Sequence, residues 1–339
     1  DLDDMRKACC YSFADYLCRL AGDFVDSTEN PYLTVFNREY YQLAPGIEME
    51  INYATSADDK QMVYYIARGH IGRSDVDVMV NYKSRYPESW GMARVMDQAM
   101  AAEALYSDET SELYIPNFKV MAAINGSGYN MSTGEPSGLL LMHGQVYQPV
   151  NSSGFFGITK SGYAVLGSTA DYYSMKNELE EGVAGFGTML VKDGEISVTA
   201  TSNYYSDRAS RTAIGITGSG RVVFMVLDGR QEPWSCGGSM IEIAQIMRDA
   251  GCVEAINLDG GGSTTFVARK PGEENLAVIN RPSDGAPRSV STSLIMVSTA
   301  PSSTAFDHAL VESEYDYLTV GASVQVTAKG ISATGNEVD

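Results

Sequence analysis

Apolar and polar residues alternate along two segments in the first part of the chain. IEMEINYA (residues 47–54) and QMVYYIAR (residues 61–68) flank the polar stretch SADDK. Alternation of this kind is typical of a strand with one buried face. We therefore predict a strand pair here, and a further apolar strand over KVMAAI (residues 119–124) that stops at Asn125-Gly126.

The two ends of the chain carry different patterns. Residues 1–30 have helical spacing and few breakers before Asn30-Pro31, so we predict an N-terminal helical appendage over 1–45. The stretch LTVGASVQVTAKGISATGNEVD alternates like the opening strands of an immunoglobulin-like β domain. The predicted main domain is therefore 46–298, followed over 299–339 by a linker and the start of such a β domain.

The clearest local structure lies between residues 211 and 259. RTAIGI and RVVFMVL are apolar strands joined by Thr217-Gly218-Ser219-Gly220, which predicts a hairpin with Arg211 opposite Val226 and next to Asp228. A helix follows over 239–250, and VEAINL then forms a short strand that ends at Asp259.

This strand-helix-strand order predicts where polar side chains meet. If both strands lie parallel in one sheet, they end at the same edge, where ligands commonly bind. Asp228 and Asp259 would then be neighbours, with Arg211 and Arg230 beside them. The predicted fold class is α+β: a mixed, largely antiparallel sheet with packed helices and a strand-helix-strand unit that carries the site.

The run Asp259-Gly260-Gly261-Gly262-Ser263-Thr264 is the sharpest local signal. Three consecutive glycines cost backbone entropy and indicate unusual dihedral angles or a backbone that lies close to a ligand. Such a turn can offer successive N–H groups to an anion, with the two hydroxyl groups as further donors. The alternative is a tight turn that binds nothing.

Three further polar features have two interpretations each. Ser239 and Glu242 fit a helix capping box, so Glu242 is either a structural cap or a carboxylate of the site. Asn257, within an apolar strand, is either a hydrogen-bonded core amide or a substrate ligand. The polar loop 280–285 and Arg288 matter only if they fold over the same sheet edge.

Composition narrows the classes of function. The net charge of −19 makes a nucleic acid or an anionic membrane an unfavourable partner. No apolar run is long enough for a transmembrane helix, and the N-terminal DLDDMRK lacks the pattern of a signal peptide, so either none existed or one was removed. The zincin, nucleophile-elbow and P-loop motifs are absent.

Cys236 and Cys252 flank one helix and either pair or remain free.

The motifs as a set resemble those of the phosphodiester glycosidase family, which includes the lysosomal mannose-6-phosphate uncovering enzyme. AINGSGYN, RTAIGI, DGR, the helix with SMIEIA, NLDGGGST and NRPSDG with Arg288 recur in the family's order over roughly residues 45–298. The departure is at Asn125, where the family usually has an aromatic pair shortly after AING. This departure bears on sugar preference more than on the family.

The resemblance implies cleavage between an anomeric carbon and a phosphate oxygen. Because phosphate is a weakly basic leaving group, arginines that neutralise it would matter more than a strong general acid. The implied catalytic carboxylates are Asp228, Asp259 and Glu242. The implied substrate-binding residues are Asn125, Arg211, Arg230, Asn257, Gly260, Gly261, Gly262, Ser263, Thr264 and Arg288.

Two other functions compete with the glycosidase. One is a carbohydrate-binding or cell-wall module without turnover, and the other is a metal-dependent phosphodiesterase in which Asp228 and Asp259 hold Ca²⁺. For the glycosidase we expect no required cofactor, although a divalent cation such as Ca²⁺ is compatible with the sequence. The expected partner is a phosphorylated glycan or sugar-1-phosphodiester, and the expected location is extracellular or on the cell surface.

Overall fold

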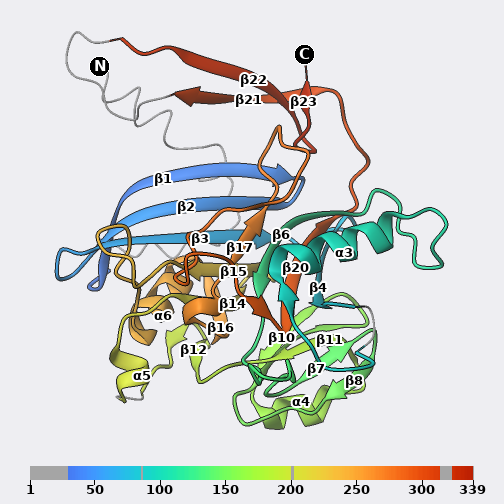
Figure 1. The fold of residues 1–339 in the computed structure, drawn as a ribbon, viewed down its shortest axis with the longest axis vertical. Coiled ribbons are helices and arrows are strands. Elements are labelled where there is room, and N and C mark those ends of the chain that lie inside the picture. The colour runs from blue at the N-terminus through green and yellow to red at the C-terminus, as the bar shows by residue number, and fades with distance from the viewer. Residues whose placement is uncertain (1–29, 85–86, 200–201, 314–322, 339) are drawn as a thin grey trace.

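The computed structural model describes residues 30–84, 87–199, 202–313 and 323–338. Its largest element is an eight-stranded sheet in the order β1-β2-β3-β15-β14-β16-β12-β13 (Figure 1). Its strands are β1 (Leu33–Ala44), β2 (Ile47–Ser56), β3 (Gln61–Gly69), β15 (Val222–Leu227), β14 (Arg211–Thr217), β16 (Cys252–Asn257), β12 (Met189–Lys192) and β13 (Glu195–Ile196).

Two five-stranded sheets pack beside the main sheet. The first has the order β18 (Ala277–Val278), β17 (Phe266–Ala268), β6 (Lys119–Asn125), β20 (Thr292–Ser298) and β4 (Val76–Tyr82). The second has the order β10 (Ala164–Gly167), β9 (Phe155–Thr159), β11 (Leu179–Ala184), β7 (Leu140–Met142) and β8 (Gln145–Gln148). A two-stranded ribbon joins β19 (Ser289–Val290) to β5 (Ala93–Arg94).

Few helices accompany these sheets in the described residues. They are α3 (Val95–Ser107), α4 (Thr169–Met175), α5 (Asn203–Ser206) and α6 (Met240–Asp249), with a single 3₁₀ turn η1 (Gly261–Ser263). The largest cluster of buried apolar side chains lies between the main sheet and the two smaller sheets. A second cluster lies between the main sheet and α6, and a third lies under α3.

The apolar run of β15 shows why this strand is central. Val222, Phe224 and Val226 belong to the core between the sheets. Val223, Met225 and Leu227 point to the other face and pack towards α6. Because successive side chains of a strand point to opposite faces, a strand with both faces buried reads as a continuous apolar run.

The α+β prediction holds for a fold dominated by antiparallel sheets, but two details were wrong. The main sheet is not mixed, since every pairing between its described strands is antiparallel. β15 and β16 run in the same direction, yet β14 lies between them and bonds to both. The hairpin pairs Arg211 with Leu227, not Val226, because Thr217 also pairs across the turn with Arg221.

The predictions for the chain ends meet different outcomes. Residues 33–44, assigned to the helical appendage, form β1 and pair with β2, so that part of the prediction was wrong. The rest of the appendage, residues 1–29, lies outside the described residues. After the main domain, β21 (Phe306–Ser313), β22 (Val326–Ser332) and β23 (Glu337–Val338) form a small sheet above β1 and β2 (Figure 1). The type of domain to which this sheet belongs stays a prediction.

The two cysteines beside α6 do not form a disulfide. Cys236 and Cys252 are both buried, and no disulfide joins them. Both lie in the core between α6 and the main sheet, where they pack as small apolar side chains.

Candidate active site

Loops that are far apart in the chain meet at one edge of the main sheet. Arg211 begins β14, while Asp259 follows the end of β16, which runs antiparallel to β14. A cavity of about 520 Å³ opens at this edge. Its lining comprises Phe186, Asn203, Tyr204, Asp207, Arg208, Ala209, Arg211, Arg230, Asp259, Gly260, Gly261, Gly262 and Arg288.

The triple-glycine turn brings backbone close to the arginines. Gly261 has φ +61°, in the left-handed region that favours glycine. A Cβ at Gly260 would lie 2.8 Å from the carbonyl oxygen of Ser210, and a Cβ at Gly262 would overlap the guanidinium of Arg288. These glycines are therefore required for close packing in the cavity wall.

The amides of this turn are mostly used within the protein. The Gly261 N–H donates to Ser210 O at 2.8 Å, and the Thr264 N–H donates to Gly261 O at 3.1 Å. The Gly260 N–H donates to the Asp259 carboxylate at 3.0 Å. Ser263 is also fully buried, as is Thr264. The turn therefore supports its neighbours and leaves few amide donors for a ligand.

Arg211 is held rigidly in the wall of the cavity. It is almost fully buried, with Nε donating to Gly238 O at 3.0 Å and Nη2 donating to the carbonyl oxygens of Tyr204 and Asp207. Its guanidinium also lies 5.2 Å from the centre of the Tyr204 ring. Burial lowers the pKa of Arg211, and the positive charge of Arg230 adds to this effect. A bound anion would compensate both.

The other two arginines differ in how they are restrained. Arg230 is exposed, and among the described residues no hydrogen bond or ion pair to its guanidinium is found. It leans over the turn, since its Nη1 lies 3.3 Å from the position of a Cβ on Gly261. Arg288 instead donates to the Asp284 carboxylate through Nε at 2.8 Å and forms an ion pair of 2.6 Å through Nη2.

Asp259 lines the cavity, as does Asp207, and of the three carboxylates predicted for the site it is the one in the lining. Burial raises the pKa of Asp259, while Ser263, the Gly260 amide and Arg288 oppose the rise. The backbone of Asp259 is held in place by Asn125, whose Nδ2 donates to Asp259 O at 2.8 Å. Asn125 Oδ1 accepts from Thr212 and from the Thr265 amide, so this side chain is a fully bonded anchor for the turn.

Asp228 occupies a closed environment next to the site. It is completely buried, and its carboxylate accepts from the Tyr65 hydroxyl, Trp234 Nε1, Asn280 Nδ2 and the Arg281 amide at 3.0–3.1 Å. Burial raises its pKa and these donors oppose the rise. Asp228 is not among the residues that line the cavity, in contrast to Asp259.

Glu242 is engaged in structural contacts. Its carboxylate accepts from both the amide and the hydroxyl of Ser239, which completes the predicted capping box of α6. It also forms an ion pair of 2.5 Å with Arg208, whose Nη1 contacts Asp58 at 2.6 Å. Glu242 therefore fixes Arg208 in the cavity wall without lining the cavity itself.

Asn257 lies at the back of the site with one atom unpaired. Its Nδ2 donates to Phe186 O at 2.5 Å, to Leu258 O at 2.7 Å and to the Tyr204 hydroxyl at 3.3 Å. Its buried Oδ1 has no hydrogen-bond partner in the structure. The amide orients Tyr204 and Phe186, which both line the cavity.

Sequence reasoning missed one wall of the cavity. Phe186 and the segment 203–209, which includes Tyr204 and Arg208, were assigned no role. The segment SNYYSDRASR reads as a polar surface loop, and only its position directly before RTAIGI could have pointed to the same sheet edge.

The two carboxylates proposed for Ca²⁺ have different surroundings. Among residues 30–338, apart from the stretches outside the described ranges, no group of three or more His, Cys, Asp or Glu side chains is arranged to hold a metal ion. Asp228 is surrounded by hydrogen-bond donors, and Asp259 lies in a cavity that is also lined by guanidinium groups. Whether a cation binds here stays a prediction. The described part of the chain also contains no helix long and apolar enough to span a membrane.

Comparisons with known proteins agree with these motifs. The mouse N-acetylglucosamine-1-phosphodiester alpha-N-acetylglucosaminidase is 31% identical over 166 residues, covering 43% of this chain and 31% of that protein. The SPbeta prophage-derived uncharacterized protein YomE of Bacillus subtilis (strain 168) is 30% identical over 181 residues, covering 50% of this chain and 27% of its own length. The matches thus span about a third or less of each relative.

Structural similarity extends over more of the chain. The zebrafish N-acetylglucosamine-1-phosphodiester alpha-N-acetylglucosaminidase catalytic domain, auto-inhibited by its pro-peptide, covers 77% of this chain and 88% of its own, with a TM-score of 0.55 and 22% identity. At this identity the likeness shows a shared fold. The phosphodiester glycosidase family model matches residues 118–297, just over half of the chain, and this range includes every residue that lines the cavity. The chain therefore belongs to the phosphodiester glycosidase family.

Proposed function

We propose that this protein hydrolyses sugar-1-phosphate diesters at the bond between the anomeric carbon and the phosphate oxygen. The observation that carries the proposal is one cavity whose lining contains Arg211, Arg230 and Arg288 together with Asp259. Guanidinium groups bind phosphate oxygens through paired, charge-assisted hydrogen bonds. A carboxylate beside them suits a reaction in which positive charge develops on the sugar.

The three arginines would have different tasks. Arg230 has no partner of its own among the described residues, so it is free to bind a phosphate oxygen. Arg211 is fixed by three carbonyl oxygens and contributes mainly a positioned positive charge. Arg288 is restrained by Asp284 at the edge of the cavity. Together they would stabilise the charge that accumulates on the departing phosphate.

Asp259 is the proposed catalytic carboxylate. During hydrolysis the C1–O bond breaks and its electron pair leaves with the phosphate, while a water oxygen bonds to C1 and releases a proton. An ionised Asp259 would either attack C1 or accept that proton from water. Asp228 and Glu242, which are fully occupied by other contacts, would support the walls of the cavity.

The test is turnover on a panel of synthetic sugar-1-phosphodiesters, with N-acetylglucosamine first because that sugar is named in the relatives. Free sugar and phosphomonoester should appear in equal amounts. Release of sugar-1-phosphate would instead show cleavage on the phosphorus side and support the metal-dependent phosphodiesterase. Tight binding of every diester without any product would support a binding module.

A chelator completes the same test. We propose that no cofactor is required, so turnover should persist after dialysis against EDTA. Complete loss of activity that Ca²⁺ restores would contradict this part of the proposal.

We propose that the natural substrate is a phosphodiester-containing glycan such as a teichoic acid or a capsular polymer. We also propose an extracellular or cell-surface location, which fractionation of the cells that make the protein would check.

A further inference from the structure

A second cavity lies at the other end of strand β6. This strand begins at Lys119 and ends at Asn125, which anchors the turn of the active site. Seven strand residues span about 20 Å at the usual rise per residue. The second cavity, of about 280 Å³, contains Lys119 and Met121 from the beginning of β6, so it is separate from the cavity around Asp259.

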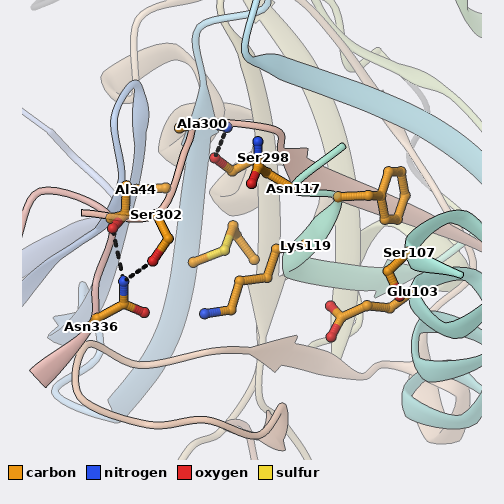
Figure 2. Close-up of a pocket in the computed structure, with 12 residues that line it drawn as sticks. Ala44, Glu103, Ser107, Asn117, Lys119, Ser298, Ala300, Ser302 and Asn336 are labelled. Atoms are coloured by element: carbon orange, nitrogen blue, oxygen red, sulfur yellow. Dashed lines mark hydrogen bonds between the residues drawn. The ribbon is translucent and has the colours of Figure 1, made fainter. Parts of the chain in front are cut away.

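Two parts of the molecule form the walls of this cavity. One wall comes from the main domain and includes Glu103 of α3 together with Lys119 (Figure 2). The opposite wall comes from the segment after the family match and includes Ser302 and Asn336 (Figure 2). The cavity therefore exists only because the small C-terminal sheet packs against the main domain.

Its lining combines apolar and polar surface. Phe118 and Met121 are buried and supply apolar atoms. Asn336 Nδ2 donates to Ser302 Oγ at 3.0 Å and to Ser303 O at 3.2 Å, which fixes the amide in the wall. An apolar floor with a few fixed polar groups is characteristic of small-ligand sites, and the volume is near the lower end of their usual range.

Lys119 is the charged group at the centre of the cavity (Figure 2). It is partly buried, and among the described residues no hydrogen bond or ion pair to its amine is found. Burial lowers its pKa, and the charges that act on it through space are those of Arg269, Glu103 and Glu274. Glu103 is already committed, because both of its oxygens accept from Arg269 and one also accepts from the Val120 amide.

The Lys119 ammonium is partly removed from water, and Glu103, which acts on it through space, is already paired with Arg269. An anion in direct contact would restore interactions that the ammonium loses on burial. We propose that this cavity is a second binding site, which takes a small hydroxylated ligand with one anionic group, such as a monosaccharide phosphate. The anionic group would pair with Lys119. The hydroxyl groups would bond to the polar side chains of the C-terminal wall, and the apolar face of the sugar would lie on Phe118 and Met121.

The test is calorimetric titration of the full chain with glucose 6-phosphate, inorganic phosphate and glucose. Glucose 6-phosphate should bind most tightly, because only it offers both the charge and the hydroxylated body. Lys119→Gln should weaken its binding at least tenfold. Ser107→Glu, which adds a negative charge on the exposed rim at the end of α3, should weaken binding without disturbing the core. The control variant Lys192→Gln, which replaces an exposed lysine on β12, should bind glucose 6-phosphate like the wild type.

The active-site cavity must be distinguished from this one. Arg230→Ala, which removes a proposed phosphate-binding group of the cavity around Asp259, should retain the binding event that Lys119→Gln weakens, since Arg230 does not line the second cavity. Loss of binding in Arg230→Ala together with retention in Lys119→Gln would overturn the proposal, as would the absence of any binding at millimolar ligand. Thermal melting of each variant shows whether it is folded. If Lys119→Gln does not fold, the binding measured with Ser107→Glu still tests the proposal.

Discussion

The loops after β15 and β16 both begin with an aspartate, but the two carboxylates have different surroundings. In both, an apolar strand ends in Asp-Gly at the same edge of the main sheet. Asp228 is enclosed by four donors and is not part of the lining of the cavity around Asp259. Asp259 accepts one hydrogen bond of good geometry, from the Gly260 amide, and opens on the arginines. The surroundings of a carboxylate therefore decide whether it anchors loops or is available for chemistry.

Replacement of Asp259 should have the largest effect on activity. Asp259→Asn keeps the size of the side chain and removes the carboxylate, so kcat should fall about 10³-fold, within the usual range for a group that transfers a proton. The measurement is kcat on the best sugar-1-phosphodiester of the panel, with Asp108→Asn as an exposed control. Turnover near the wild-type value would show that Asp259 is not the working carboxylate.

Loss of Arg230 should have the next largest effect. Arg230→Ala removes an exposed guanidinium that has no partner in the described residues, so stability should be unchanged while kcat/KM falls about 10²-fold. Steady-state kinetics and a melting curve check both halves of this statement. Arg73→Ala, which removes an exposed arginine bonded to Asp75 far from the cavity, is the matched control. Equal losses in both variants would remove the phosphate-binding role.

Replacement of Asp228 should affect stability more than chemistry. Asn at this position turns an NH₂ group towards neighbours that are already donors, and a buried mismatch of this kind costs about 2 kcal/mol. Urea denaturation should show this loss, while kcat per folded molecule stays within a fewfold of the wild type. A drop in kcat as large as that of Asp259→Asn, in a variant of normal stability, would instead place Asp228 in the chemistry.

The smallest effect is a dependence of stability on pH at Asp259. Because the folded pKa is raised above the usual 3.8, the folded state binds more protons than the unfolded chain between these two values. The free energy of unfolding contributed by this group therefore falls as pH rises through the folded pKa. Asp259→Asn lacks this term, so urea denaturation at pH 4 and pH 7 should show the variant gaining stability relative to the wild type at the higher pH. A constant difference would contradict the raised pKa.

Local sequence patterns were sufficient for the elements that carry the site. The alternation of residues 47–68, the apolar runs around residues 214, 225 and 256, and the capping box of α6 each depend on neighbours along the chain, and the structure contains all of them. The shared sheet edge also followed, because strand direction is fixed once the hairpin and the crossover are known.

Tertiary structure alone decided which polar groups are free. The sequence around Asp228 does not show that its carboxylate is enclosed, since the donors come from residues 65, 234, 280 and 281. The wall formed by Phe186 and Tyr204 and the second cavity around Lys119 likewise depend on contacts between distant segments. Hydrogen-bond partners and burial are properties of the folded chain. The chemistry of a polar residue therefore depends on the distant residues that the fold brings into contact with it.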